Sequence, residues 1–213
     1  MACTPYFPNH ERDFMGRRSD HSREELHELI LQTGEALMAE TGFSGFSARE
    51  VAKRVGYTIG TIHNVFGTVD GLVTAINTRT FALWADSLEA RLAEAGEDRI
   101  AALVAAYFAF ARANPLRWSA IYEHRAPPEA ISPDQAAARA RLMQIVVAEV
   151  AAALGRAPDD AIGTLARSLV ATVHGHCMFD VSGSWAAMGQ RDVEAAALAR
   201  VRESIAAAGS ADT

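Results

Sequence analysis

Cysteine is scarce in this chain, which has only Cys3 and Cys177 among its 213 residues. Two cysteines so far apart do not make a disulfide framework, so we expect a reducing compartment. Long apolar runs are also missing: the longest, residues 100–111, is too short to span a bilayer and lies between Arg99 and Arg112. The N-terminus lacks the basic-then-apolar pattern of a signal peptide. These absences predict a cytoplasmic protein with no membrane segment.

Signatures of catalysis are missing as well. The sequence has no phosphate loop, no nucleophile elbow and no acid–base pair at a fixed spacing. His174, His176 and Cys177 have a spacing that does not place all three side chains on one helix face, so no metal site is expected. We therefore predict no catalytic residues, no metal and no cofactor, and a helical enzyme with a site formed only by tertiary contacts is the weaker alternative.

Helical periodicity is what the sequence does contain, because no segment alternates with period two for long enough to indicate a strand. Capping boxes at Ser22–Glu25 and Ser47–Glu50 mark two helix starts. The pattern predicts an all-α fold of about nine helices. We expect them near residues 22–42, 47–55, 58–66, 69–95, 98–114, 115–124, 134–154, 159–181 and 192–208, with a loop over residues 125–134.

The second and third of these helices are short and are joined by Gly56-Tyr57, which predicts a helix-turn-helix. Gly56 suits a turn that needs a left-handed residue. Ala52 is small, as a close helix crossing requires. The expected shared core is Val51, Val55, Ile62 and Phe66.

The second helix of this motif would present neutral polar side chains outward, which suits major-groove reading. Asn can pair with adenine, and Thr can meet a base or a thymine methyl group. Backbone N–H groups at Thr58 and Gly60 could meet phosphate. The predicted DNA contacts are Ser47, Arg49, Thr58, Ile59, Gly60, Thr61, His63, Asn64 and Thr68. The alternative is two small helices with an ordinary polar surface.

The stretch from Phe46 to Ile76, FSAREVAKRVGYTIGTIHNVFGTVDGLVTAI, resembles the DNA-binding signature of the TetR/AcrR family of transcriptional regulators. The positions that match are Ala52, Gly56, Thr58, Gly60, Thr61, Phe66 and Leu72. The stretches FAFARANPLRW and LVATVHGHCMF resemble a branch of this family with a His-Gly in its eighth helix, here His174-Gly175. The resemblance implies a homodimer joined through its last two helices, which reads a two-fold symmetric site on double-stranded operator DNA. It also implies a repressor that a small effector releases.

Two positions depart from the family pattern. His63 stands where the family usually has tyrosine, and Val69 stands where it usually has a lysine that grips phosphate. Up to Asp70 the chain has seven basic and ten acidic residues, a net charge of −3. We therefore expect weaker and less salt-dependent DNA binding than is usual for the family. The alternative is a TetR-like small-molecule-binding or interaction protein that has lost DNA binding.

Residues 1–21 have prolines, a glycine and mixed charge with little periodicity, which predicts a flexible N-terminal arm. The resemblance predicts a DNA-binding domain over residues 22–68 and an effector-binding and dimerisation domain over 69–209. Arginines 17, 18 and 23 of the arm and first helix could supply positive charge. A cavity among the middle helices would take a small hydrophobic or aromatic effector. The predicted ligand contacts are Trp84, Tyr107, Phe108, Trp118, Tyr122, His124, His174 and Cys177, with Phe110, Ile121 and Phe179 as further candidates. The alternative for each aromatic residue is ordinary core packing.

Overall fold

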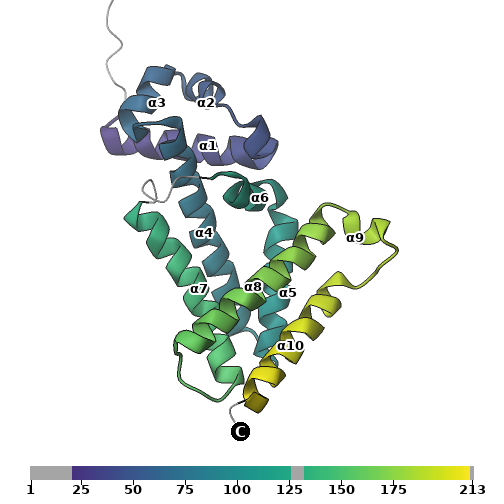
Figure 1. Ribbon diagram of the computed structural model, residues 1–213. Coiled ribbons are helices and arrows are strands. Elements are labelled where there is room, and N and C mark those ends of the chain that lie inside the picture. The colour runs from purple at the N-terminus through teal and green to yellow at the C-terminus, as the bar shows by residue number, and fades with distance from the viewer. Residues whose placement is uncertain (1–20, 126–131, 212–213) are drawn as a thin grey trace, which may run out of the picture.

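The computed structural model describes residues 21–125 and 132–211, and these residues form ten helices and no strand (Figure 1). The helices are α1 (Arg23–Gly45), α2 (Ala48–Val55), α3 (Ile59–Phe66), α4 (Val69–Ala93), α5 (Arg99–Ala113), α6 (Pro115–Glu123), α7 (Pro133–Ala153), α8 (Asp160–Val181), α9 (Ser184–Ala187) and α10 (Val193–Ala211). The predicted all-α class is confirmed.

Helices α1, α2 and α3 form a small unit, called the head below, at the N-terminal end of α4 (Figure 1). The head encloses its own apolar core because each helix has one buried stripe. Members of this core include Ile30, Leu37, Met38, Val51 and Ile62, with Leu72 and Ile76 from the first turns of α4.

The remaining helices form the body, and α4 runs from the head into its centre (Figure 1). The predicted inward residues of α4 are all buried, from Leu72 and Ile76 in the head core to Trp84, Leu88 and Leu92 in the body core. Helix α10 packs along α8 and α5. Helix α4 is therefore one continuous helix that belongs to both the head core and the body core.

Helix α6 lies beneath α1 and fastens the head to the body. Arg117 of α6 forms an ion pair with Glu35 of α1 at 2.8 Å, and both side chains are largely buried. Arg79 of α4 also bonds Glu35, at 3.1 Å, and pairs with Glu28. Ala120 of α6 belongs to the head core.

Three differences from the sequence prediction have local causes. Gly42 is non-helical with φ of 68°, as a helix stop would be, but one further turn follows it and α1 ends at Gly45. The single-turn helix α9 has four residues between Gly183 and Gly189, too few to show a helical period. The predicted arm lies outside the described residues except for His21, and most of the predicted loop, residues 126–131, lies outside them too.

Candidate nucleic-acid interface and ligand cavity

The turn between α2 and α3 has the geometry that the sequence predicts. Gly56 adopts the left-handed conformation, with φ of 83° and ψ of 22°. The Tyr57 N–H donates to the Ala52 carbonyl at 2.9 Å, which closes the end of α2. Val51 and Ile62 are fully buried, and Val55 and Phe66 pack against the same core. The two helices are therefore held at a fixed angle by one glycine and one shared core.

The outer face of α3 carries the polar side chains proposed for base contact. Thr58, His63 and Asn64 are exposed and Thr61 is half-buried. The hydroxyl oxygens of Thr58 and Thr61 lie 3.4 Å apart. Ile59 is half-buried and packs against the head core, so it offers less surface to a partner than the others.

The His63 ring is already engaged on one side, because its Nδ1 lies 3.3 Å from the Gly67 carbonyl oxygen. A carbonyl oxygen only accepts, so Nδ1 carries the proton in this contact. In the neutral ring the remaining nitrogen, Nε2, is then an acceptor. A phosphate contact from Nε2 of the neutral ring would therefore replace the contact with Gly67.

Ser47 and Thr68 act as helix caps. The Glu50 N–H donates to the Ser47 hydroxyl at 3.4 Å, and the Gly71 N–H donates to the Thr68 hydroxyl at 2.9 Å. Each hydroxyl still has its own proton for a further acceptor. Val69, directly after Thr68, packs against the head core.

Pairing within the molecule absorbs much of the acidic charge of the head. Arg54 pairs with Glu40 at 2.9 Å and with Glu50 at 3.2 Å, and its hydrogen bond lowers the pKa of Glu40. Glu28 and Glu35 face the arginines of α4 and α6 instead, as described above. The net charge of −3 therefore overstates the negative charge available at the outer surface.

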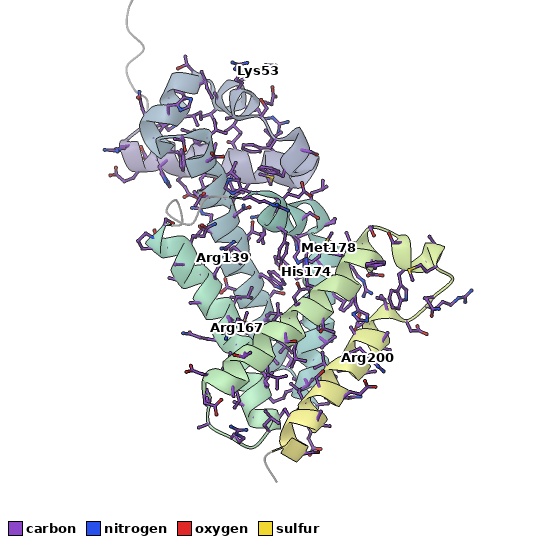
Figure 2. All side chains as sticks on the ribbon, in the orientation of Figure 1. Lys53, Arg139, Arg167, His174, Met178 and Arg200 are labelled. Atoms are coloured by element: carbon purple, nitrogen blue, oxygen red, sulfur yellow. The ribbon has the colours of Figure 1, made fainter. Side chains whose placement is uncertain are left out.

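The head exposes Arg23, Arg49, Lys53 and Arg54, and of these Arg54 is paired as described above. Arg23 and Arg49 have no ion-pair partner among the described residues, and Lys53 has only Glu50 at 3.8 Å. Figure 2 shows Lys53 at the end of the molecule farthest from α10. Lys53, the only lysine of the sequence, was not among the predicted contacts. Lys53 lies in the last helical turn of α2, close to the Gly56-Tyr57 connection, and this position could have indicated a DNA contact.

A cavity of about 250 Å³ lies in the body between α4, α5, α6, α7 and α8. Of the predicted ligand contacts it brings together Trp84, Tyr107 and Tyr122, along with Ile121. The Trp84 ring meets Tyr107 edge-on at 4.7 Å and stacks on Phe110 at 5.3 Å. Phe110 supports the cavity wall without lining it.

A chain of polar groups stands behind this wall. The Tyr107 hydroxyl lies 3.0 Å from His174 Nδ1 and 3.4 Å from the Tyr122 hydroxyl. Burial raises the pKa of both tyrosines, so both hydroxyls stay protonated. Burial lowers the pKa of His174, which keeps that imidazole neutral. These groups are therefore uncharged hydrogen-bonding partners at neutral pH.

The other predicted ligand contacts lie elsewhere. Phe108, Trp118 and Cys177 are fully buried in the body core and do not line the cavity, and burial raises the pKa of Cys177 to about 12. His124 lies at the junction with the head, 3.4 Å from Asp70. Phe179, by contrast, leaves 46% of its surface exposed on α8.

Several lining residues were not predicted, most of them from α7. They are Phe81 and Leu88 of α4, Arg139, Leu142, Met143 and Val146 of α7, and Val170 of α8. The sequence prediction favoured aromatic and polar residues, whereas the stripe on α7 is aliphatic and has the ordinary pattern of a core helix. Its one distinguishing signal is Arg139 within that stripe.

A helix-turn-helix head on an all-helical body with an internal cavity defines a class of DNA-binding transcriptional regulators. Residues 30–76 match the family described as bacterial regulatory proteins, tetR family, and residues 100–203 match the tetracyclin repressor-like C-terminal domain. The chain belongs to the TetR family of transcriptional regulators. The family and its relatives are described as regulators, not as enzymes.

Curated relatives agree with this assignment. HTH-type transcriptional regulators of Mycobacterium bovis and Mycobacterium tuberculosis are 27% identical over 127 residues, 58% of this chain and 54% of theirs. The chain thus spans about half the length of these curated relatives.

Three solved structures share the fold. A Rhodococcus sp. RHA1 protein of unknown function has a TM-score of 0.69 at 23% identity, covering 90% of this chain and 98% of its own. A tetR-family regulator from Streptomyces coelicolor has a TM-score of 0.64 at 15% identity, covering 91% and 85%. The multidrug binding protein EbrR, solved with imidazole, has a TM-score of 0.59 at 21% identity, covering 87% and 96%. At these identities the likeness concerns the fold.

No helix within the described residues is long and apolar enough to cross a membrane.

Proposed function

We propose that this chain is a ligand-responsive repressor. It binds a two-fold symmetric operator as a homodimer and leaves the DNA when a small hydrophobic or aromatic effector enters the cavity. In this proposal residues 22–68 read DNA, residues 69–209 bind effector and dimerise, and the arm before residue 22 adds contacts. The protein works in the cytoplasm without a cofactor.

The observation that carries this proposal is that the cavity and the head share two helices. Helix α4 lines the cavity with Trp84 and fills the head core with Ile76. Helix α6 lines the cavity with Ile121, and the preceding residue, Ala120, lies in the head core. An effector that changes the positions of α4 and α6 therefore changes the position of the head. The dimer then has two states that differ in the distance between its two heads. Because effector and operator favour different states, binding of one weakens binding of the other.

Dimerisation is proposed through the outer faces of α8 and α10. The outer face of α8 combines small residues, Ala171 and Gly175, with Met178 and Phe179, which are 40% and 46% exposed. A second copy would cover these apolar side chains, and small residues permit close helix approach. The solved multidrug binding protein with imidazole also lends support to a small-molecule site in this fold.

The test is selection of bound sequences from random double-stranded DNA with the full chain. We expect a two-fold symmetric site, because two identical heads read two half-sites. Labelling with an amine-reactive ester then reports which end of the protein faces the DNA. Lys53 is the only lysine of the sequence, so operator DNA should protect the single side-chain amine from labelling. Enrichment of no sequence would contradict the proposal.

A second candidate is a small-molecule-binding protein of this fold without DNA binding. The observation that favours it is Val69, which packs against the head core where a phosphate-gripping lysine would be expected. Failure of selection together with retained binding of small molecules would favour this second function.

A further inference from the structure

The one charged group of the described cavity wall is a hydrogen-bond donor, whereas the two tyrosine hydroxyls can both donate and accept. Among the described residues, Arg139 is the only charged one that lines the cavity, and this lining contains no aspartate, glutamate, asparagine or glutamine. Trp84 is 1% exposed and contributes its ring to the apolar part of the wall. The wall therefore favours a ligand that carries acceptors.

Arg139 differs from its neighbour Arg141 in how its charge is used. Arg141 is paired with Asp86 at 2.7 Å and with Glu89 at 2.6 Å. Arg139 has no ion-pair partner in the part of the chain that the structure describes, and its guanidinium lies 5.1 Å from the centre of the Phe81 ring. Figure 2 labels Arg139 on α7 and His174 on α8. An exposed, uncompensated cation thus stands at the mouth of an apolar cavity.

The position of Arg139 relative to the tyrosines agrees with this placement. Arg139 and Tyr122 line the same cavity. Burial raises the pKa of Tyr122, and the charge of Arg139 partly opposes that rise. The Tyr122 hydroxyl stays protonated and can donate a hydrogen bond. A guanidinium presents its donors in a planar fork that matches a carboxylate.

The volume of the cavity limits the size of the apolar part of the ligand. A cavity of about 150 Å³ holds benzene, and this one has about 250 Å³. The space suits one ring with a short chain. Apolar surface around that ring comes from Phe81, Leu142 and Met143.

We propose that the effector is a small apolar monocarboxylate, one ring or its equivalent in size. Its carboxylate pairs with Arg139 at the mouth, and its body lies against Trp84 between α4 and α7. This inference rests on the proposed function in one respect, namely that the cavity is the effector site.

The experiment compares three probes of one shape with the full chain at pH 7.5: 4-phenylbutyrate, 4-phenylbutyramide and 4-phenylbutylamine. Isothermal titration should show the acid binding about tenfold or more tightly than the neutral amide, because charge-assisted hydrogen bonds exceed neutral ones. The amine should bind least. Arg139→Gln should remove the preference for the acid and leave the amide affinity unchanged. Arg141→Gln is the matched control on the same helix and should keep the preference.

Location is tested with Met143→Trp, which fills the cavity and should abolish binding of all three probes. An amide that binds wild-type protein as tightly as the acid would overturn the carboxylate assignment and leave the effector cavity standing. A preference for the acid that survives in Arg139→Gln would also overturn the pairing of the carboxylate with Arg139, and the effector cavity would still stand. Acid binding that persists in Met143→Trp also overturns the assignment. If none of the probes binds, both this inference and the effector cavity fall, whereas operator selection judges DNA binding separately.

Discussion

The head and the cavity differ in how far apart in the sequence their residues lie. The helix-turn-helix depends on a cap at Ser47, a left-handed Gly56 and a core that includes Ile62, all within about twenty residues. The cavity draws on five helices, from Phe81 to Val170. A short contiguous stretch therefore specifies the head, whereas only tertiary packing brings the cavity together.

The two regions also differ in how they use charge. In the head, several acids are paired: Glu40 and Glu50 with Arg54 of the same unit, and Glu35 with arginines of α4 and α6. At the cavity, Arg139 is the one charged side chain among the described lining residues, most of which are apolar. Specificity in the head is therefore expected from neutral side chains on α3, and specificity in the cavity from one cation.

The largest expected effect comes from removing a wall of the cavity. Trp84→Ala should lower the free energy of unfolding by about 3–5 kcal/mol, because the ring is fully buried and stacks on Phe110. Urea denaturation measures this loss. Trp185→Ala on α9 is the matched control: its ring is half-buried, and about 1 kcal/mol is expected. Equal losses in the two variants would show that Trp84 is not a packing centre of the body.

The head should be most sensitive at the joint between α3 and α4. A Cβ on Gly71 would lie 2.2 Å from the Phe66 carbonyl oxygen, and backbone cannot move as a flexible side chain can. Gly71→Ala should therefore cost about 1–3 kcal/mol of stability and reduce operator affinity. Gly60→Ala is the control in α3, where a Cβ meets only Thr58 Oγ1 at 3.5 Å. That variant should be as stable as wild type or more so.

Local rules predicted the elements well for identifiable reasons. The Ser22–Glu25 capping box is present in both directions, and Gly56 has the left-handed conformation that the turn requires. Such features depend on residues three or four apart, so a single sequence reveals them. They failed at α9, where one turn between two glycines offers no period.

Tertiary placement explains what could not be predicted at the cavity. His124 has the chemistry of a ligand contact, yet it lies at the head junction beside Asp70 and Asn77. Met143 and Val146 look like ordinary core residues, and they line the cavity. Periodicity shows which side of a helix is apolar, but it does not show whether that side meets another helix or an empty space.

A smaller effect is expected from restoring charge to the joint. Val69→Lys should raise operator affinity and steepen the dependence of log K on log salt by about 0.9 for each phosphate contact, or about twice that for a dimer. Fluorescence anisotropy across a salt series measures the slope. Loss of the half-buried valine side chain will lower stability slightly.

Leu83→Lys provides the matched control for this change. Leu83 is exposed on the same helix but belongs to the body, so a lysine at this position adds the same charge away from the head. Its salt slope should equal that of wild type. If Val69→Lys shows no gain in affinity, the expectation that the missing lysine weakens DNA binding is wrong.

The smallest effect concerns the pH dependence of stability at His174, behind the cavity wall. Burial lowers the pKa of His174 from its ordinary value of 6.5. Between the lowered pKa and 6.5, the unfolded chain binds a proton that the folded chain does not, so stability falls as pH falls through this window and is fully present above it. His174→Gln removes this titration and the contact with Tyr107, and should cost about 1 kcal/mol at pH 7.5. Urea denaturation at pH 7.5 and 5.5 should show a smaller deficit at the lower pH, because only wild type carries the proton penalty there. An equal deficit at both pH values would mean that folding leaves the protonation of His174 unchanged.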